Sequence, residues 1–308
     1  MLKILRYFSK FLVALLAIFI LWIGAPFILA ISKLKQEECL YCPVSRAHIE
    51  YQTSPNFYSQ DNEDYILSYI FKDIQQGFYV DIGANDPNLI SVTKYFYERG
   101  WNGINIDANP NFKPLYERFR PKDTNLFIGI SNKQSTIDFY NLIGVNALST
   151  FERDIAEVHA AKNGYKIQTI KVPVRTLNSV LDEYRVKQIT FMTIDVEGHE
   201  RQVLESLNFQ KYRPSVLLIE STYPCTQVPV YDKWEEILLQ NDYKYVIFDG
   251  LNRYYLDKRL PNFKELSARF SFMEQCLRQV KLIKKNKWAK VIVDVMRKRH
   301  RDSIEKSQ

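Results

Sequence analysis

The chain has 308 residues, of which 46% are hydrophobic and 25% charged, and its formal net charge is +7. This composition suits one large α/β domain with a sizeable core plus appendages. With 10 glycines and 12 prolines the chain is not a low-complexity or disordered polymer, and its 4 cysteines are too few for a disulfide scaffold.

The N-terminal part is predicted to lie outside the globular domain. An uncharged apolar run from Phe11 to Ile31 is long enough to cross a bilayer as a helix, and lysines flank it on both sides. The alternative, a cleaved signal peptide, fits less well because the run is long and no small-residue cleavage site follows it. We expect a retained membrane segment over 1–35 and a linker over 36–58.

The body alternates strand-like and helix-like segments. Hydrophobic periodicity and breaker residues predict helices over 61–74, 89–99, 110–119, 177–184, 200–207 and 234–240. They predict strands over 78–81, 101–107, 125–130, 136–140, 167–174, 189–195, 214–221, 243–249 and 253–256. This order predicts an α/β fold with a mostly parallel sheet, covered on both faces and closed by an antiparallel hairpin. The polar stretch 144–164 is predicted to be a lid or substrate loop.

The most informative motif is the apolar strand that ends at Asp81 and turns at Gly83. About two dozen residues later a second strand ends in Asp107, as in the adenosine-binding half of doubly wound folds. The further glycines of a dinucleotide fingerprint are missing, and Pro87 supplies no N–H to a phosphate. A nucleoside-bearing ligand without a pyrophosphate therefore fits better. Asp107 is predicted to accept hydrogen bonds from the ribose hydroxyls. Capping of turns is the alternative role for both carboxylates.

A second cluster, Ile194 to Glu200, follows a later strand and contains three acids and one imidazole after Ile194. Asp195, Glu197 and His199 are the candidate general bases, because carboxylates and imidazole are the usual groups for that role. Helix capping by acids is the alternative explanation. Asp81, Asp107, Ser131 and Asp195 are all predicted at carboxyl ends of strands, where ligands bind in such sheets.

These motifs carry a resemblance to a known family. The chain resembles the FkbM family of S-adenosylmethionine-dependent methyltransferases over roughly residues 58 to 257. The matching pieces are 59–64, 80–85, 103–110, 194–200, 213–220 and 249–253.

The resemblance implies a seven-stranded Rossmann-like methyltransferase fold over 59–260, the cofactor S-adenosylmethionine, and O-methylation of a hydroxyl on a saccharide or similar acceptor. It implies no metal. It also implies that Asp195 and Glu197 face the transferred methyl group. The implied cofactor-binding residues are Gln60, Asp81, Gly83, Asn85, Asp107 and Ser131. Asp81, Gly83 and Asn85 would line the methionine side of the cofactor. Asp107 would bind the ribose, and Ser131 would contact the adenine edge. The chain departs from the commoner family pattern at Asp86-Pro87, which affects the contact to the methionine carboxylate.

Location and partners follow from the two ends of the chain. Residues 261–308 are predicted to form a helical basic tail, whose apolar side fits an anionic membrane surface or packs on the domain. No nucleic-acid motif is present. The charges that flank the apolar run favour a domain outside the cytoplasm. The cytosolic synthesis of S-adenosylmethionine favours a membrane-attached domain that faces the cytoplasm, and this is the orientation we expect.

Cys39 and Cys42 form a single CxxC pair, and the second pair that a zinc site would need is missing. Cys225 and Cys276 are expected to be ordinary thiols.

Two other functions stay open from the sequence. The spacing of Asp195 and Glu197 is similar to the acidic pair with which metal-dependent glycosyltransferases hold a cation and a nucleotide sugar. A non-catalytic, membrane-anchored binding module on the same fold is the other.

Overall fold

A computed structural model describes residues 57–285, with side chains to residue 278. The predicted membrane segment, Cys39, Cys42 and most of the basic tail lie outside these residues. Within 57–285, no helix is both long and apolar enough to span a bilayer. Residues 57–275 belong to one compact unit.

The core of this unit is a seven-stranded sheet with the strand order β3-β2-β1-β7-β8-β10-β9. Its strands are β1 (Phe78–Ile82), β2 (Asn102–Ile106), β3 (Thr124–Leu126), β7 (Phe191–Ile194), β8 (Val216–Glu220), β9 (Tyr243–Phe248) and β10 (Asn252–Asp257). The first five run parallel, and β10 lies antiparallel between β8 and β9. The expected mostly parallel sheet with a terminal hairpin is therefore confirmed.

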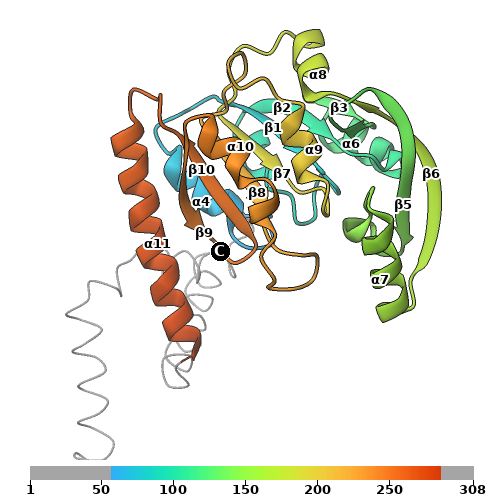
Figure 1. Cartoon of the computed structure of the whole chain (residues 1–308). Coiled ribbons are helices and arrows are strands. Elements are labelled where there is room, and N and C mark those ends of the chain that lie inside the picture. Colours follow the sequence, from blue (N-terminus) through green and yellow to red (C-terminus); the bar gives the residue numbers. More distant parts are fainter. Residues whose placement is uncertain (1–56, 286–308) are drawn as a thin grey trace, which may run out of the picture. The chain divides into compact units, whose positions relative to one another are not determined.

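Helices cover both faces of the sheet (Figure 1). They are α4 (Glu63–Ile70), α5 (Lys94–Tyr97), α6 (Lys113–Phe119), α8 (Leu177–Glu183), α9 (Glu200–Glu205), α10 (Glu235–Gln240) and α11 (Phe263–Lys285). Successive strand residues point to opposite faces. Val80 and Ile82 of β1 therefore join the apolar cluster that contains Val180 of α8 and Leu204 of α9. On the other face, Phe96 of α5 packs on Phe191 of β7.

A three-stranded sheet, not expected from the sequence, lies beside the main one. It contains β4 (Gly129–Ile130), β5 (Ser135–Ile143) and β6 (Lys166–Arg175) in the order β4-β6-β5. The single strand predicted over 125–130 is split between β3 and β4, which belong to different sheets. The predicted loop 144–164 contains the helix α7 (Arg153–Asn163), which packs against the long β5–β6 ribbon (Figure 1). Short 3-10 turns occur at Pro110–Phe112, Asn146–Leu148 and Tyr231–Lys233.

Two local expectations are wrong. The helix predicted over 89–99 shortens to α5, because Asp86 Oδ1 accepts hydrogen bonds from the N–H groups of Asn88 and Leu89 and Ile90 has φ +50°. This local turn competes with helix formation. Cys276 is disulfide-bonded and not an ordinary thiol, while Cys225 is free.

Candidate functional site

The strand order reverses between the parallel strands β1 and β7, because β2 and β3 follow β1 on one side and β8 follows β7 on the other. The crevice beyond their carboxyl ends is therefore the expected ligand site. A cavity lies there, and Gly83, Asn85, Asp107, Asp195 and Glu197 line it together with residues from the β4 region and the turn at 146–149. The enclosed part measures only about 50 Å³. Small-molecule sites have roughly 300–1,000 Å³. A nucleoside-sized ligand therefore requires part of the cavity lining to move outward.

Gly83 allows the carboxyl ends of β1 and β7 to approach each other closely. It has φ +84°, and a Cβ atom built on it would lie 1.6 Å from the carbonyl oxygen of Asp195. Its N–H and that of Ala84 both donate to the carbonyl of Ile106, at 2.9 and 3.1 Å. Glycine is required for both reasons, since only glycine adopts this φ freely and lacks a Cβ.

Asp107 is held in place before any ligand binds. Its Oδ2 accepts from the N–H of Asn85 at 2.8 Å, and its Oδ1 accepts from the N–H of Asn109 at 2.7 Å. Burial raises the pKa of Asp107 to about 6, although both backbone hydrogen bonds oppose the rise. Each carboxylate oxygen keeps a second lone pair. The arrangement therefore leaves one acceptor position on each oxygen for a pair of adjacent hydroxyl groups.

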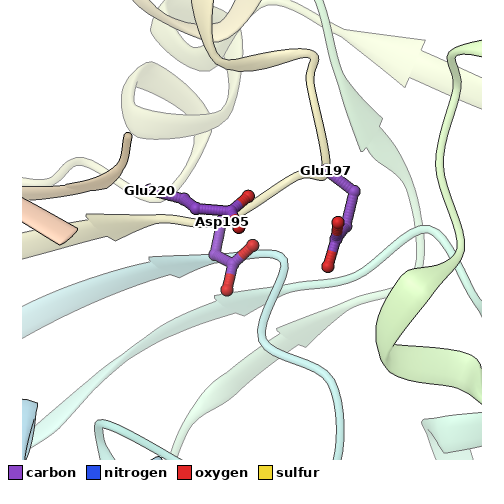
Figure 2. Close-up of side chains that lie close together, drawn as sticks. All are labelled: Asp195, Glu197 and Glu220. Carbon is purple, nitrogen blue, oxygen red and sulfur yellow. The ribbon is translucent and has the colours of Figure 1, made fainter. Parts of the chain in front are cut away.

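Three carboxyl groups gather on the β7–β8 side of this crevice (Figure 2). The oxygens of Asp195, Glu197 and Glu220 lie within 4.8 Å of one another, a spacing that could hold a metal ion. Burial raises the pKa of Asp195 to about 7, and the charge of Glu200 adds to the rise. The pKa values of Glu197 and Glu220 are raised well above the usual range by burial and by the neighbouring acids. The Oε2 atom of Glu197 is buried and has no hydrogen-bond partner.

Buried carboxylates must be neutralised by a proton or a cation. Burial raises the pKa of Glu220, and the hydrogen bond that its carboxyl shares with Asp195 adds to the rise. Glu197 has no such partner. Its side chain therefore fits a cationic group in the crevice, such as the sulfonium of S-adenosylmethionine or a divalent ion.

Glu200, the first residue of α9, binds the preceding loop, and α9 has no side-chain cap of the kind the sequence left open for these acids. Glu200 Oε1 accepts from the N–H groups of Val196 at 3.3 Å and Gly198 at 3.0 Å. The Glu200 carboxylate is therefore hydrogen-bonded to the loop that carries Glu197. Glu197 itself has φ +52°, and Thr150 Oγ1 donates to its carbonyl oxygen at 2.8 Å.

His199 is engaged on both sides of its ring. Nδ1 lies 2.8 Å from Glu152 Oε1, and Nε2 lies 3.2 Å from the hydroxyl of Ser131. The ring is buried and contacts Phe151. Neither His199 nor Ser131 lines the cavity at the strand ends. These contacts favour a positioning role for His199.

Two further residues expected in the cofactor site also lie away from the cavity lining. Asp81 is buried behind it and accepts a hydrogen bond from Thr93 Oγ1 at 2.9 Å, and burial raises its pKa to about 7. Gln60 is exposed and precedes α4. Sequence reasoning missed Glu220 and Thr150. A carboxylate at the end of the apolar strand β8 was the available signal for Glu220; Thr150 had none.

Comparison with known proteins shows which family the chain is similar to. The model of the methyltransferase FkbM domain matches residues 81–245. No curated protein sequence matches the chain significantly. Solved structures with similarity to the chain include a TehB-like SAM-dependent methyltransferase from Corynebacterium glutamicum and precorrin-6y C5,15-methyltransferase from Geobacter metallireducens.

The first of these structures has a TM-score of 0.37 and 9% identity, and the match covers 69% of this chain and 95% of that one. The second has a TM-score of 0.35 and 11% identity, with 66% and 90% covered. At these scores the two structures carry no further argument. The assignment rests on the family match, which spans more than half of the chain.

Proposed function

We propose that this chain, a member of the FkbM methyltransferase family with the cofactor S-adenosylmethionine, methylates a hydroxyl group. The proposed acceptor is a saccharide, glycan or lipid-linked molecule at a membrane. One observation carries the proposal. Gly83, Asp107, Asp195 and Glu197, which come from three different strand ends, line a single cavity.

The residues present fit this cofactor. Asp107 is fixed by two backbone N–H groups and keeps free acceptor positions for the ribose hydroxyls. Gly83 allows the chain to approach a ligand closely. The unpartnered Oε2 of Glu197 fits the positive charge of a sulfonium. When bound, S-adenosylmethionine supplies an electrophilic methyl group.

The protein must bring the acceptor oxygen into line with that methyl group and remove the hydroxyl proton. Asp195 and Glu197 are the proposed bases, because they line the cavity and their pKa values are raised. A base whose pKa lies near the working pH is the most effective. His199 would act through its hydrogen bond to Glu152, outside the cofactor cavity.

Direct binding tests the proposal. Calorimetry of the full chain with S-adenosylmethionine should show one site, and Asp107→Ala should weaken it at least about tenfold, the equivalent of 1.4 kcal/mol for the lost charge-assisted hydrogen bonds. Asp73→Ala is the matched control, because Asp73 is an exposed acid that pairs with Arg269 and does not line the cavity. Equal affinity in the Asp107→Ala and control variants would remove Asp107 from the site.

The acidic triad favours one competing function, a metal-dependent glycosyltransferase. That enzyme would bind UDP in the presence of Mn²⁺ and retain no radiolabelled S-adenosylmethionine. The methyltransferase proposal predicts the opposite pattern. A non-catalytic module would instead bind the cofactor without transferring tritium from its methyl group to any glycan or lipid fraction.

Membrane attachment through the apolar segment 11–31 and the basic tail belongs to the same proposal, with the domain facing the cytoplasm, where the cofactor is made. The disulfide of Cys276 opposes this orientation, because disulfides persist mainly in oxidising compartments. Protease digestion of sealed vesicles decides the matter: the domain is cleaved on the outside only if it faces outward.

A further inference from the structure

The three carboxyl groups drawn in Figure 2, here called the acidic triad, have the spacing of ligands around one cation. One oxygen each of Asp195, Glu197 and Glu220 lie within 4.8 Å of one another. Oxygens that share a Mg²⁺ ion lie about 3–4.2 Å apart, because each is about 2.1 Å from the ion, and those that share a Ca²⁺ ion lie up to about 5 Å apart. A single divalent ion can therefore contact all three carboxyl groups.

The carboxyl group of Glu197 supplies a second, independent observation. Glu197 is 8% exposed, and its Oε2 atom is buried and accepts no hydrogen bond from any residue that the structure describes. The two side-chain charges that act on Glu197, those of Asp195 and Glu200, are both negative. A buried carboxylate in such surroundings needs a cation or a proton. An ion is held at about 2.1–2.6 Å, closer than a water molecule approaches, so an oxygen without accessible surface can still be a ligand.

The other two members of the triad are in contact with each other. The carboxyl groups of Asp195 and Glu220 share a hydrogen bond although both residues are acids. Two carboxylates in contact repel each other unless a proton or a cation lies between them. A divalent ion can take the place of that proton and neutralise Glu197 at the same time.

Backbone hydrogen bonds hold each of the three ligands in position. The N–H of Asp195 donates to the carbonyl of Ile82 at 2.9 Å. Glu220 is the last residue of β8, which is paired with β7 on one side and with β10 on the other. Thr150 Oγ1 donates to the carbonyl of Glu197 at 2.8 Å. Because the ligands are held before an ion arrives, little ordering is needed on binding.

We propose that the acidic triad binds one Mg²⁺ or Mn²⁺ ion and that this ion holds the acceptor hydroxyl, which differs from the metal-free site that the family resemblance implies. The role of the ion rests on the proposed function. Three protein ligands leave about half of an octahedral shell open, which suits Mg²⁺ and Mn²⁺ better than Ca²⁺ with its six to eight ligands. Asp195 and Glu197 line the cofactor cavity, so an acceptor oxygen in that cavity can reach the open positions.

The ion assists the proposed methyl transfer by making the bound hydroxyl more acidic. The hydroxyl proton passes to an oxygen of Asp195 or Glu197 that the ion leaves free. The new O–C bond then forms while the C–S bond of the sulfonium breaks, and S-adenosylhomocysteine is released. The charge of three carboxylates exceeds that of one divalent ion, so negative charge remains for the sulfonium and both cations can be bound together.

Electron paramagnetic resonance of Mn²⁺ added to the metal-free full chain tests the site. One ion per chain should bind with a Kd below about 1 mM, and excess Mg²⁺ should displace it. Glu197→Gln and Glu220→Gln should each weaken the binding at least about tenfold, because loss of even a group behind a metal ligand costs about 10–100-fold. Glu63→Gln is the matched control, because Glu63 is also a buried acid, 3% exposed, but accepts a hydrogen bond from Asn252 and does not belong to the triad.

Urea unfolding shows whether the variants are folded and gives a second readout of binding. Mn²⁺ should raise the midpoint of the unmodified chain and of Glu63→Gln, but not that of the two triad variants. The ion site is overturned if no Mn²⁺ binds to the unmodified chain below about 1 mM, or if Glu197→Gln and Glu220→Gln bind it as the control does.

The role of the ion is tested by chelation. EDTA should stop the transfer of tritium from the cofactor to the glycan or lipid fraction, and Mg²⁺ should restore it, while calorimetry still shows cofactor binding to the metal-free chain. Transfer that continues in EDTA overturns this role. Cofactor binding without Mn²⁺ binding refutes the ion site alone, whereas Mn²⁺ binding without cofactor binding refutes the proposed function and with it the role of the ion.

Discussion

Gly83→Ala should damage the cofactor site more than any substitution at an equally left-handed but uncrowded glycine. The new Cβ would lie 1.6 Å from the carbonyl oxygen of Asp195, and real Cβ atoms do not approach closer than 3.0 Å. One of the two backbones must therefore move by about 1.4 Å. The hydrogen bond from Asp195 N to Ile82 O, at 2.9 Å, lies directly at this point.

The expected loss of stability has two parts. An alanine at φ +84° costs roughly 1–2 kcal/mol. Overpacking adds about 1–3 kcal/mol. Because Asp195 moves with its carbonyl, the affinity for S-adenosylmethionine should also fall at least about tenfold.

Gly100→Ala separates the two parts. Gly100 has φ +86°, but nothing lies within 4 Å of the Cβ that alanine would add. This variant should lose only the roughly 1–2 kcal/mol of backbone strain and keep its cofactor affinity. Urea unfolding gives the stabilities and calorimetry gives the affinities. If Gly83→Ala binds the cofactor as tightly as Gly100→Ala, the close approach of Gly83 and Asp195 has no part in the site.

Three further outcomes are expected. The preference for S-adenosylmethionine over S-adenosylhomocysteine, measured by calorimetry, should increase as the pH rises through about 7, because Asp195 then ionises and attracts the sulfonium; a constant ratio would contradict this. Burial raises the pKa of Glu63 to about 8 and that of Asp249 to about 6, so the stability that these two groups contribute is fully present in acid and is lost as the pH rises through these values. Urea midpoints at several pH values should show this fall, and Glu63→Gln should reduce it. Thr150→Val removes the hydrogen bond to the Glu197 carbonyl and the one accepted from the N–H of Glu152, and should lower stability by about 1–3 kcal/mol in urea unfolding; an unchanged midpoint would show that the two bonds contribute nothing.

The sequence predicts the central sheet well because its strands are apolar runs with clear breakers. The run before Asp81, the run before Asp107 and the closing hairpin all lie where the periodicity places them. Because parallel strands end at one edge, the convergence of Asp107 and Asp195 also follows from the pattern.

The rest of the site depends on contacts that no local pattern encodes. The wall of the cofactor cavity comes partly from the second sheet, whose strand β4 has only two residues, Gly129–Ile130. Ser131 follows that strand, but its hydroxyl contacts His199.

The difference between S-adenosylmethionine binding in the unmodified chain and in Asp107→Ala tests the central claim most directly. The account predicts one calorimetric site in the unmodified chain and an affinity at least about tenfold weaker in the variant, while Asp73→Ala binds normally. No binding to the unmodified chain, or equal binding to Asp107→Ala, would contradict it.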